Sequence, residues 1–121
     1  MKIENFSKGR KGEDIAAKFL EEKGFTVLER NWHTRFGELD VIAIKDDVIV
    51  FVEVKLKVGD LFGTPEEMIN KRKMFQVLNT AEMYLLKDPK LKALKRRIDA
   101  VCIVANKEGD VIRINHYEAI T

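Results

Sequence analysis

Apolar and polar residues follow two different periods along the chain, which predicts a mixture of helices and strands. Between Lys8 and Lys23 the apolar residues recur every three to four positions, as in a helix with one buried face. Ser7 can cap the start of this helix and Gly24 can end it. A second helix is predicted over 64–87, because Thr, Pro and Glu occupy its cap and first turn and Asp-Pro follows it.

The remaining apolar segments have the length and composition of strands. Asp46-Asp47 and the segment 106–110 supply turn residues between neighbouring strands. The five predicted strands cover residues 25–31, 37–45, 48–56, 98–105 and 111–117. The resulting order αβββαββ predicts an α/β fold with a mixed sheet, with one helix on each face or both helices packed together on the sheet.

Length and composition narrow the class of protein. The chain has 121 residues and a mass of 14.0 kDa, so we interpret residues 1–121 as a single domain. The longest apolar run, residues 48–52, is far too short to cross a bilayer, so we expect no membrane partner. The single cysteine, Cys102, excludes an internal disulfide and a multi-cysteine zinc site, and we expect a cytoplasmic location.

Acidic residues on the second and third predicted strands form the main candidate site. If these strands pair around Asp46-Asp47, Asp40 faces Glu53 and Glu38 faces Lys55, all on one face of the sheet. The opposite face then carries only apolar side chains, namely Leu39, Val41, Val52 and Val54. Two directly opposed carboxylates are destabilising, so the pair calls for a compensating charge, and a divalent cation is the best candidate.

Asp40 and Glu53 suit magnesium or manganese, because magnesium sites use one or two carboxylates together with waters and substrate phosphates. A backbone carbonyl near residue 54 would complete the ligands. Such a cation would polarise a phosphodiester and lower the pKa of an attacking water. Lys55, on the same face as Glu53, could orient that water or stabilise charge on the transferring phosphoryl group.

The two helices each contribute a further candidate. Lys71 shares a helical stripe with Phe75 and Leu78, so we expect it to face the sheet rather than solvent. Glu13 lies at the edge of the apolar stripe of the first helix. A carboxylate and an ammonium group directed at a sheet that already carries acids are unusual for a purely structural arrangement.

These residues carry a resemblance to a known superfamily. Gly37-Glu38-Leu39-Asp40, followed by Phe51-Val52-Glu53-Val54-Lys55, resembles the PD-(D/E)XK nuclease signature, although Leu39 replaces its proline. With the Gly9–Ala17 run, Lys71, Tyr84-Leu85 and Arg97–Val101, the chain is most similar to the YraN-like family of small uncharacterised bacterial proteins. That family is related in fold to archaeal-type Holliday junction resolvases and other restriction-endonuclease-like proteins.

The resemblance implies roles for individual residues. Asp40, Glu53 and Lys55 would hold magnesium and activate water, and Glu13 would be an auxiliary acid, as in the resolvases. Glu38, beside the signature aspartate, is a second auxiliary candidate. The implied substrate is DNA rather than RNA, in branched or structured form. A homodimer is also implied, because a four-way junction is cut at two symmetric positions.

Charges are segregated along the chain in a way that fits a polyanionic partner. Residues 1–12 carry a net charge of +3 and residues 87–97 carry +5, whereas residues 36–67 carry −5. The run 87–97 is equally consistent with a solvated loop. Trp32 and Phe36 could stack on bases, although a place at the edge of the core is the favoured interpretation for Trp32. The predicted nucleic-acid contacts are Lys8, Arg10, Lys11, Arg35 and Lys57.

Three hypotheses remain open from the sequence. The leading one is a divalent-metal-dependent endonuclease acting on DNA. The second is a catalytically inactive nucleic-acid-binding module, and the third is a protein-interaction factor on the same scaffold. Outside the candidate site, Cys102 is expected to be buried and inert, and Asp99 to form a structural ion pair with a neighbouring arginine.

Overall fold

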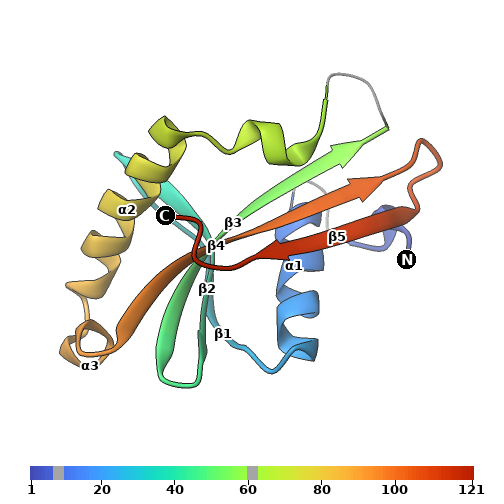
Figure 1. Cartoon of the computed structure of the whole chain (residues 1–121). Helices are drawn as coiled ribbons and strands as arrows, with labels where there is room; N and C mark the ends of the chain where they lie inside the picture. Colours follow the sequence, from blue (N-terminus) through green and yellow to red (C-terminus); the bar gives the residue numbers. More distant parts are fainter. Residues whose placement is uncertain (7–9, 60–62) are drawn as a thin grey trace.

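The structure is a computed structural model that describes residues 1–6, 10–59 and 63–121 (Figure 1). Its helical elements are η1 (Ile3–Asn5), α1 (Lys11–Glu22), η2 (Pro65–Met68), α2 (Lys71–Leu85) and α3 (Pro89–Lys92). Its strands are β1 (Thr26–Thr34), β2 (Gly37–Lys45), β3 (Val48–Val58), β4 (Lys95–Ala105) and β5 (Val111–Tyr117). All five predicted strands are therefore present.

The strands form one mixed sheet with the order β1-β2-β3-β4-β5. β3 and β4 run parallel, and every other neighbouring pair is antiparallel. The connection between the two parallel strands passes through η2, α2 and α3. The α/β fold with a mixed sheet is confirmed.

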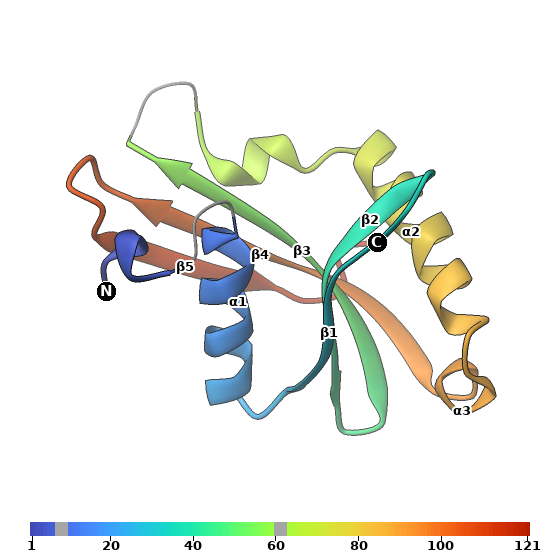
Figure 2. The ribbon, with the colours of Figure 1, turned by 180° about the vertical axis from the view of Figure 1, so that it is seen from behind.

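The sheet has a separate apolar cluster on each face, and each cluster includes one of the long helices (Figure 2). The α1 cluster comprises Ile15, Ala16, Leu20, Phe25, Val41, Ala43, Val50, Val52, Val54, Val101 and Ile103. The α2 cluster comprises Leu39, Ile42, Ile49, Phe51, Val77, Ala81, Tyr84, Leu85 and Ile98. Of the two helix arrangements left open by the sequence, the structure has one helix on each face.

β2 and β3 form a hairpin in the predicted register. Val41 pairs with Val52, and the ladder continues to Lys45 and Val48. Asp46 and Asp47 close the hairpin with φ of +52° and +62°, the left-handed conformation that two-residue hairpin turns require.

Beyond Val41 and Val52 the two strands separate, and we call this point the fork. β2 continues back toward α2 together with β1, while β3 continues alongside β4 to Val58, as both views show (Figures 1 and 2). The prediction that Glu38 lies opposite Lys55 is therefore wrong, because the ladder ends before either residue. Leu39 also lies on the other face from the one predicted, since it packs in the α2 cluster.

The second helix is shorter than predicted. Thr64 precedes only one 3-10 turn, η2, and the backbone is extended at Ile69 and Asn70 before α2 begins. Asn70 is the true cap of α2, because its side chain accepts a hydrogen bond of 2.9 Å from the Lys73 backbone N–H. The separate turn has a physical reason: Glu66 of η2 is held by the side chains of Arg113 and Tyr117 on β5.

The other helix boundaries also differ in detail. α1 begins at Lys11, with Arg10 at its N-cap, whereas the predicted cap, Ser7, and the predicted first residue, Lys8, lie outside the described residues. Gly24 follows α1 with φ of +96°, as expected for a glycine that ends a helix. α2 ends at Leu85, before the predicted end near Lys87, and Asp88 caps a short helix, α3, that was not predicted.

Residues at both ends of the chain contact the sheet, at β5 and at β4. Lys2 forms a β-bridge with Asp110, and the Val111 N–H donates to the Met1 carbonyl over 2.8 Å. Near the other end, the Ile120 N–H donates to the Ile98 carbonyl over 2.8 Å. The first residues therefore extend the sheet beside the start of β5.

Asp99 is fully buried and forms the predicted structural ion pair. Its carboxylate accepts two hydrogen bonds from Arg97, one from the Ala119 N–H and one from His116, over 2.7–3.0 Å. The hydrogen bonds from His116 and Arg97 outweigh burial and lower the pKa of Asp99. This cluster joins β4, β5 and the residues that follow β5.

Cys102 is fully buried on β4, and burial raises the pKa of its thiol to about 11. A thiol in this state is neutral near pH 7, as expected for an inert cysteine. None of the helices in the described part of the chain has the length and apolar character needed to cross a membrane.

Candidate functional site

The fork brings Asp40 of β2 and Glu53 of β3 together. Because β2 leaves β3 at this point, the Val54 N–H is no longer paired with the β2 backbone, and it donates instead to Asp40 Oδ2 over 2.9 Å. Asp40 is only 9% exposed and Glu53 only 4% exposed. The strand separation therefore creates a position where two carboxyl groups from different strands are buried side by side.

The surroundings of Glu53 raise the pKa of its carboxyl group. Burial is the largest cause that raises the pKa of Glu53 to about 8, and the hydrogen bond and negative charge of Asp40 are the next. A carboxyl group with this pKa is mostly protonated near neutral pH, and in that form it can donate a hydrogen bond to Asp40. A buried pair of this kind is costly in a metal-free protein and is the arrangement that a cation would stabilise.

Two lysines near Glu53 act against the rise of its pKa. The Nζ atom of Lys73, on α2, lies 3.8 Å from Oε2 of Glu53, and Lys55 lies two residues beyond Glu53 on β3. The positive charges of both residues lower the pKa of Glu53, although less than burial and Asp40 raise it. Within the described residues Lys55 is half-buried and forms no salt bridge, so its ammonium group is free to meet an anion.

Lys73, rather than Lys71, is the lysine of α2 that contacts Glu53, and the prediction that Lys71 faces the sheet is wrong. Lys71 is exposed, and the stripe used to place it is exposed as well: Phe75 is 68% and Leu78 is 43% exposed. The face of α2 that is buried carries Val77, Thr80, Ala81, Tyr84 and Leu85. Extending that spacing by four residues toward the start of α2 leads to Lys73, which is the signal that the sequence contained.

α1 places Glu13 near the same pair from the other face of the sheet. Burial and then the negative charge of Asp40 raise the pKa of Glu13. The close packing of α1 on β3 explains this position, since a Cβ on Gly12 would lie 3.4 Å from Val54. Glu13 is also held by Arg10, 3.7 Å away.

α2 supports the β2 side of the fork by direct packing. Gly37 lies so close to α2 that a Cβ would be 2.6 Å from Thr80 Oγ1 and 2.9 Å from Gln76 Cγ. Gln76 Nε2 also donates a hydrogen bond of 3.0 Å to the carbonyl of Phe36. The glycine of the Gly-Glu-Leu-Asp motif is therefore needed for this contact, which fixes the start of β2 and with it Asp40.

The donor set fits a cation that needs few protein ligands. Within residues 1–6, 10–59 and 63–121, no group of three or more His, Cys, Asp or Glu side chains is arranged to hold a metal ion. Magnesium typically takes one or two carboxylates and completes its shell with water and substrate oxygens. Asp40 and Glu53 therefore suit magnesium better than zinc, which takes three or four protein ligands.

The remaining predicted residues are distributed around this site. Arg10 is exposed and bonds to Asn31, and half-buried Lys11 lines a pocket of about 310 Å³ with Gly12, Glu13, Val54 and Leu56. Arg35 is exposed, Lys57 is half-buried on β3, and Glu38 is exposed on β2. Lys8 lies outside the described residues.

The basic run 87–97 is not part of the site. Lys95, at the start of β4, is in register with Val48, at the hairpin end of β3, whereas Glu53 lies further along the strand. Three of its cations are already paired, namely Lys87 with Glu29, Arg96 with Glu82 and Arg97 with Asp99. Trp32 is half-buried against Tyr84, as expected of a residue at the edge of the core, with the ring centroids 5.2 Å apart.

Comparison with known proteins places these features in a family. The model of the uncharacterised protein family UPF0102 matches residues 12–103, which include both strands of the fork and all of α2. A UPF0102 protein of Syntrophomonas wolfei is 44% identical over 105 residues, which is 87% of this chain and 89% of the relative. A UPF0102 protein of Desulforamulus reducens is 37% identical over 117 residues, which is 96% of both chains. A UPF0102 protein of Persephonella marina is 43% identical over 99 residues, which is 82% of this chain and 84% of the relative. The chain belongs to the UPF0102 family.

Proposed function

We propose that the protein is a divalent-metal-dependent nuclease that hydrolyses phosphodiester bonds in DNA, with branched or structured DNA as its substrate. The observation that supports this best is the buried Asp40–Glu53 pair at the fork, with the ammonium groups of Lys55 and Lys73 beside it. The likeness of the Asp-x12-Glu-x-Lys spacing to the PD-(D/E)XK signature, and of the chain to archaeal-type Holliday junction resolvases, adds to it.

Asp40 and Glu53 would hold the cation, which we propose to be magnesium or manganese. When bound, it would polarise the phosphodiester and lower the pKa of an attacking water. The hydrogen bond from the Val54 N–H fixes the orientation of the Asp40 carboxylate. Because Asp40 is set by this backbone contact and Glu53 by β3, both ligands are oriented before substrate arrives.

The lysines have different tasks in this proposal. Lys55 forms no salt bridge in the described part of the chain, so its charge can stabilise the negative charge that develops on the phosphoryl oxygens. Lys73 contacts Glu53 and keeps that carboxyl group directed into the fork. Glu13, held near Asp40 by α1, is suited to receive a proton from water, because its raised pKa brings it closer to neutral pH.

The test is cleavage of labelled duplex, flap and four-way-junction DNA with magnesium or manganese. The wild type is expected to cut at least one of these substrates, and Glu53→Gln and Lys55→Met are expected to lose at least about 100-fold in rate. Lys73→Met should reduce the rate as well, whereas Lys71→Met is the matched control from the exposed face of the same helix.

Equal activity of the wild type and Glu53→Gln, or no cleavage of any substrate by either, would contradict the nuclease proposal. DNA binding that persists without cleavage would instead support the non-catalytic nucleic-acid-binding module.

A further inference from the structure

A groove next to the fork has the composition of a site for unpaired nucleotides. It has a volume of about 820 Å³ and lies between the β1–β2 turn, η2 and α2. Its described lining consists of Phe36, Met68, Asn70, Arg72, Lys73, Phe75, Gln76, Asn79 and Met83. These residues include two cations, three amides and two phenyl rings, and no carboxylate.

The aromatic rings of the groove are unusually exposed. Phe36 is 57% and Phe75 is 68% exposed, whereas apolar rings of this size are normally buried. The Arg35 guanidinium lies 4.8 Å from the centroid of the Phe36 ring, which adds a positive charge at the rim. Exposed rings between cations are the arrangement that binds single-stranded nucleic acids, because bases stack on the rings and phosphates pair with the cations.

The groove is continuous with the candidate catalytic pair through Lys73. This residue lines the groove, and its Nζ atom is 3.8 Å from Glu53. The hydrogen bond from Gln76 Nε2 to the Phe36 carbonyl holds one wall of the groove to α2. A strand whose bases occupied the groove would therefore have its phosphates close to the fork.

We propose that this groove binds an unpaired stretch of DNA, stacking bases on Phe36 and Phe75 and pairing phosphates with Arg72. The inference rests on the proposed nuclease function and makes it more specific: the preferred substrate has single-stranded nucleotides beside the bond that is cut. A fully paired duplex cannot present the faces of its internal bases to the two rings, so it would bind more weakly.

The test is fluorescence anisotropy of a labelled oligothymidylate and of a blunt duplex of the same length, both in EDTA so that no cleavage occurs. We expect the wild type to bind the oligothymidylate more tightly than the duplex. Phe36→Ala and Phe75→Ala should each weaken oligothymidylate binding by about fivefold or more and the double variant by about 20-fold or more, with little effect on the duplex. Arg72→Gln should reduce the salt dependence of binding.

Matched controls separate the groove from general effects. Leu86→Ala removes a similarly exposed apolar side chain, 69% exposed, from the other end of α2. Lys18→Gln removes one positive charge from an exposed position on α1. Both controls should bind like the wild type, and thermal unfolding should show that every variant is folded.

The proposal would be overturned if the double variant bound the oligothymidylate as tightly as the wild type, or if the wild type did not prefer the oligothymidylate to the duplex. Displacement of the oligothymidylate by polyglutamate at a similar concentration would also overturn it, because it would indicate an acidic protein partner. The nuclease proposal fails separately. If no DNA is cut but the phenylalanine variants lose oligothymidylate binding, the groove proposal is supported and the nuclease proposal is contradicted. If cleavage depends on Glu53 but not on the two rings, only the groove proposal is contradicted.

Discussion

Replacing Glu53 by glutamine should stabilise the metal-free protein, because the amide can donate a hydrogen bond to Asp40 without the cost of keeping a carboxyl group protonated. The pKa of Glu53 is raised from the ordinary value of 4.5 to about 8. At pH 7 the unfolded chain releases a proton that the folded chain retains. Because the folded wild type keeps this proton from pH 4.5 up to pH 7, its free energy of unfolding at pH 7 is lowered by at most about 3 kcal/mol. For a chain of this length that is up to about 10 °C in Tm.

The sign of the pH dependence follows from the raised pKa. Below pH 4.5 the group is protonated in both states, so the hydrogen bond to Asp40 contributes fully to the stability of the wild type. As pH rises from 4.5 to about 8, the unfolded state increasingly gains from ionisation and that contribution is lost. The advantage of Glu53→Gln should therefore be near zero at pH 4.5 and increase steadily toward pH 8.

The assay is urea-induced or thermal unfolding in EDTA at several pH values, repeated with magnesium. Glu38→Gln is the matched control, because Glu38 is exposed two residues from Asp40, and it should change stability by less than about 0.5 kcal/mol. Magnesium should raise the Tm of the wild type but not that of Glu53→Gln, since only the wild type retains both ligands. A variant that is no more stable than the wild type at pH 8, or an advantage that does not depend on pH, would refute the reasoning.

Three further substitutions test other contacts of the fold. Gly37→Ala should lower the free energy of unfolding by about 1–3 kcal/mol, because the added methyl group would overlap Thr80. Gly12→Ala should lower it by less, and equal losses for the two variants in urea titrations would contradict this packing. Glu66→Gln should lower the Tm at pH 7. The hydrogen bond from Arg113 lowers the pKa of Glu66 to about 2, so the difference in Tm between variant and wild type should vanish as pH falls from 4.5 toward 2. A difference that persists at pH 2 would exclude that cause. Asp99→Asn should cost about 3 kcal/mol or more in urea titrations, since it leaves a buried histidine and an arginine without their anion, and a cost below 1 kcal/mol would show that the cluster is dispensable.

Several strand ends were predictable because turn residues with positive φ mark them: Gly24 before β1, Asp46 and Asp47 between β2 and β3, and Gly109 before β5. Asp46 and Asp47 fixed the hairpin, and with it the register that brings Asp40 near Glu53. The separation of β2 and β3 was not predictable from the alternation of apolar and polar residues. This alternation continues through Leu39 and Val54, whereas the backbone hydrogen bonds between the two strands end at Val41 and Val52.

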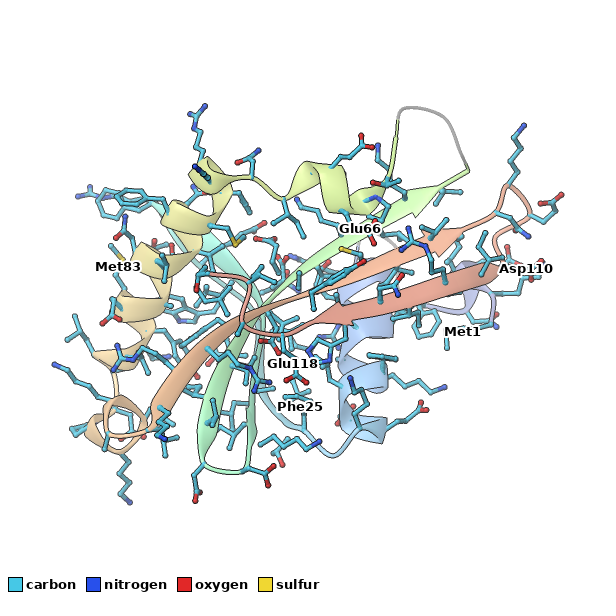
Figure 3. The ribbon with its side chains drawn as sticks, viewed as in Figure 1. Met1, Phe25, Glu66, Met83, Asp110 and Glu118 are labelled. Carbon is cyan, nitrogen blue, oxygen red and sulfur yellow. The ribbon has the colours of Figure 1, made fainter. Side chains whose placement is uncertain are left out.

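The helix that supports the site was predicted less accurately, because two capping signals compete. Thr64-Pro65-Glu66 is a strong local start, but Glu66 is taken by Arg113 on β5, a contact between residues 47 positions apart that no local pattern contains. Asn70 then caps the actual helix. Lys71 was placed from its spacing with Phe75 and Leu78, which are exposed, whereas the buried stripe that includes Val77 leads to Lys73. Figure 3 labels Glu66, which lies between η2 and the sheet, where the side chains of Arg113 and Tyr117 bind it.

The bridge between Lys2 and Asp110 has a consequence for how copies of this protein can associate. Residues 1–3 occupy part of the outer side of β5, so a strand of another molecule cannot align freely there. On the opposite border, β1 has a bulge between Val27 and Glu29 and a left-handed residue at Asn31, both of which interrupt a straight row of hydrogen-bonding groups. Two copies would therefore have to meet through helices or loops, and a shared sheet running across both is disfavoured.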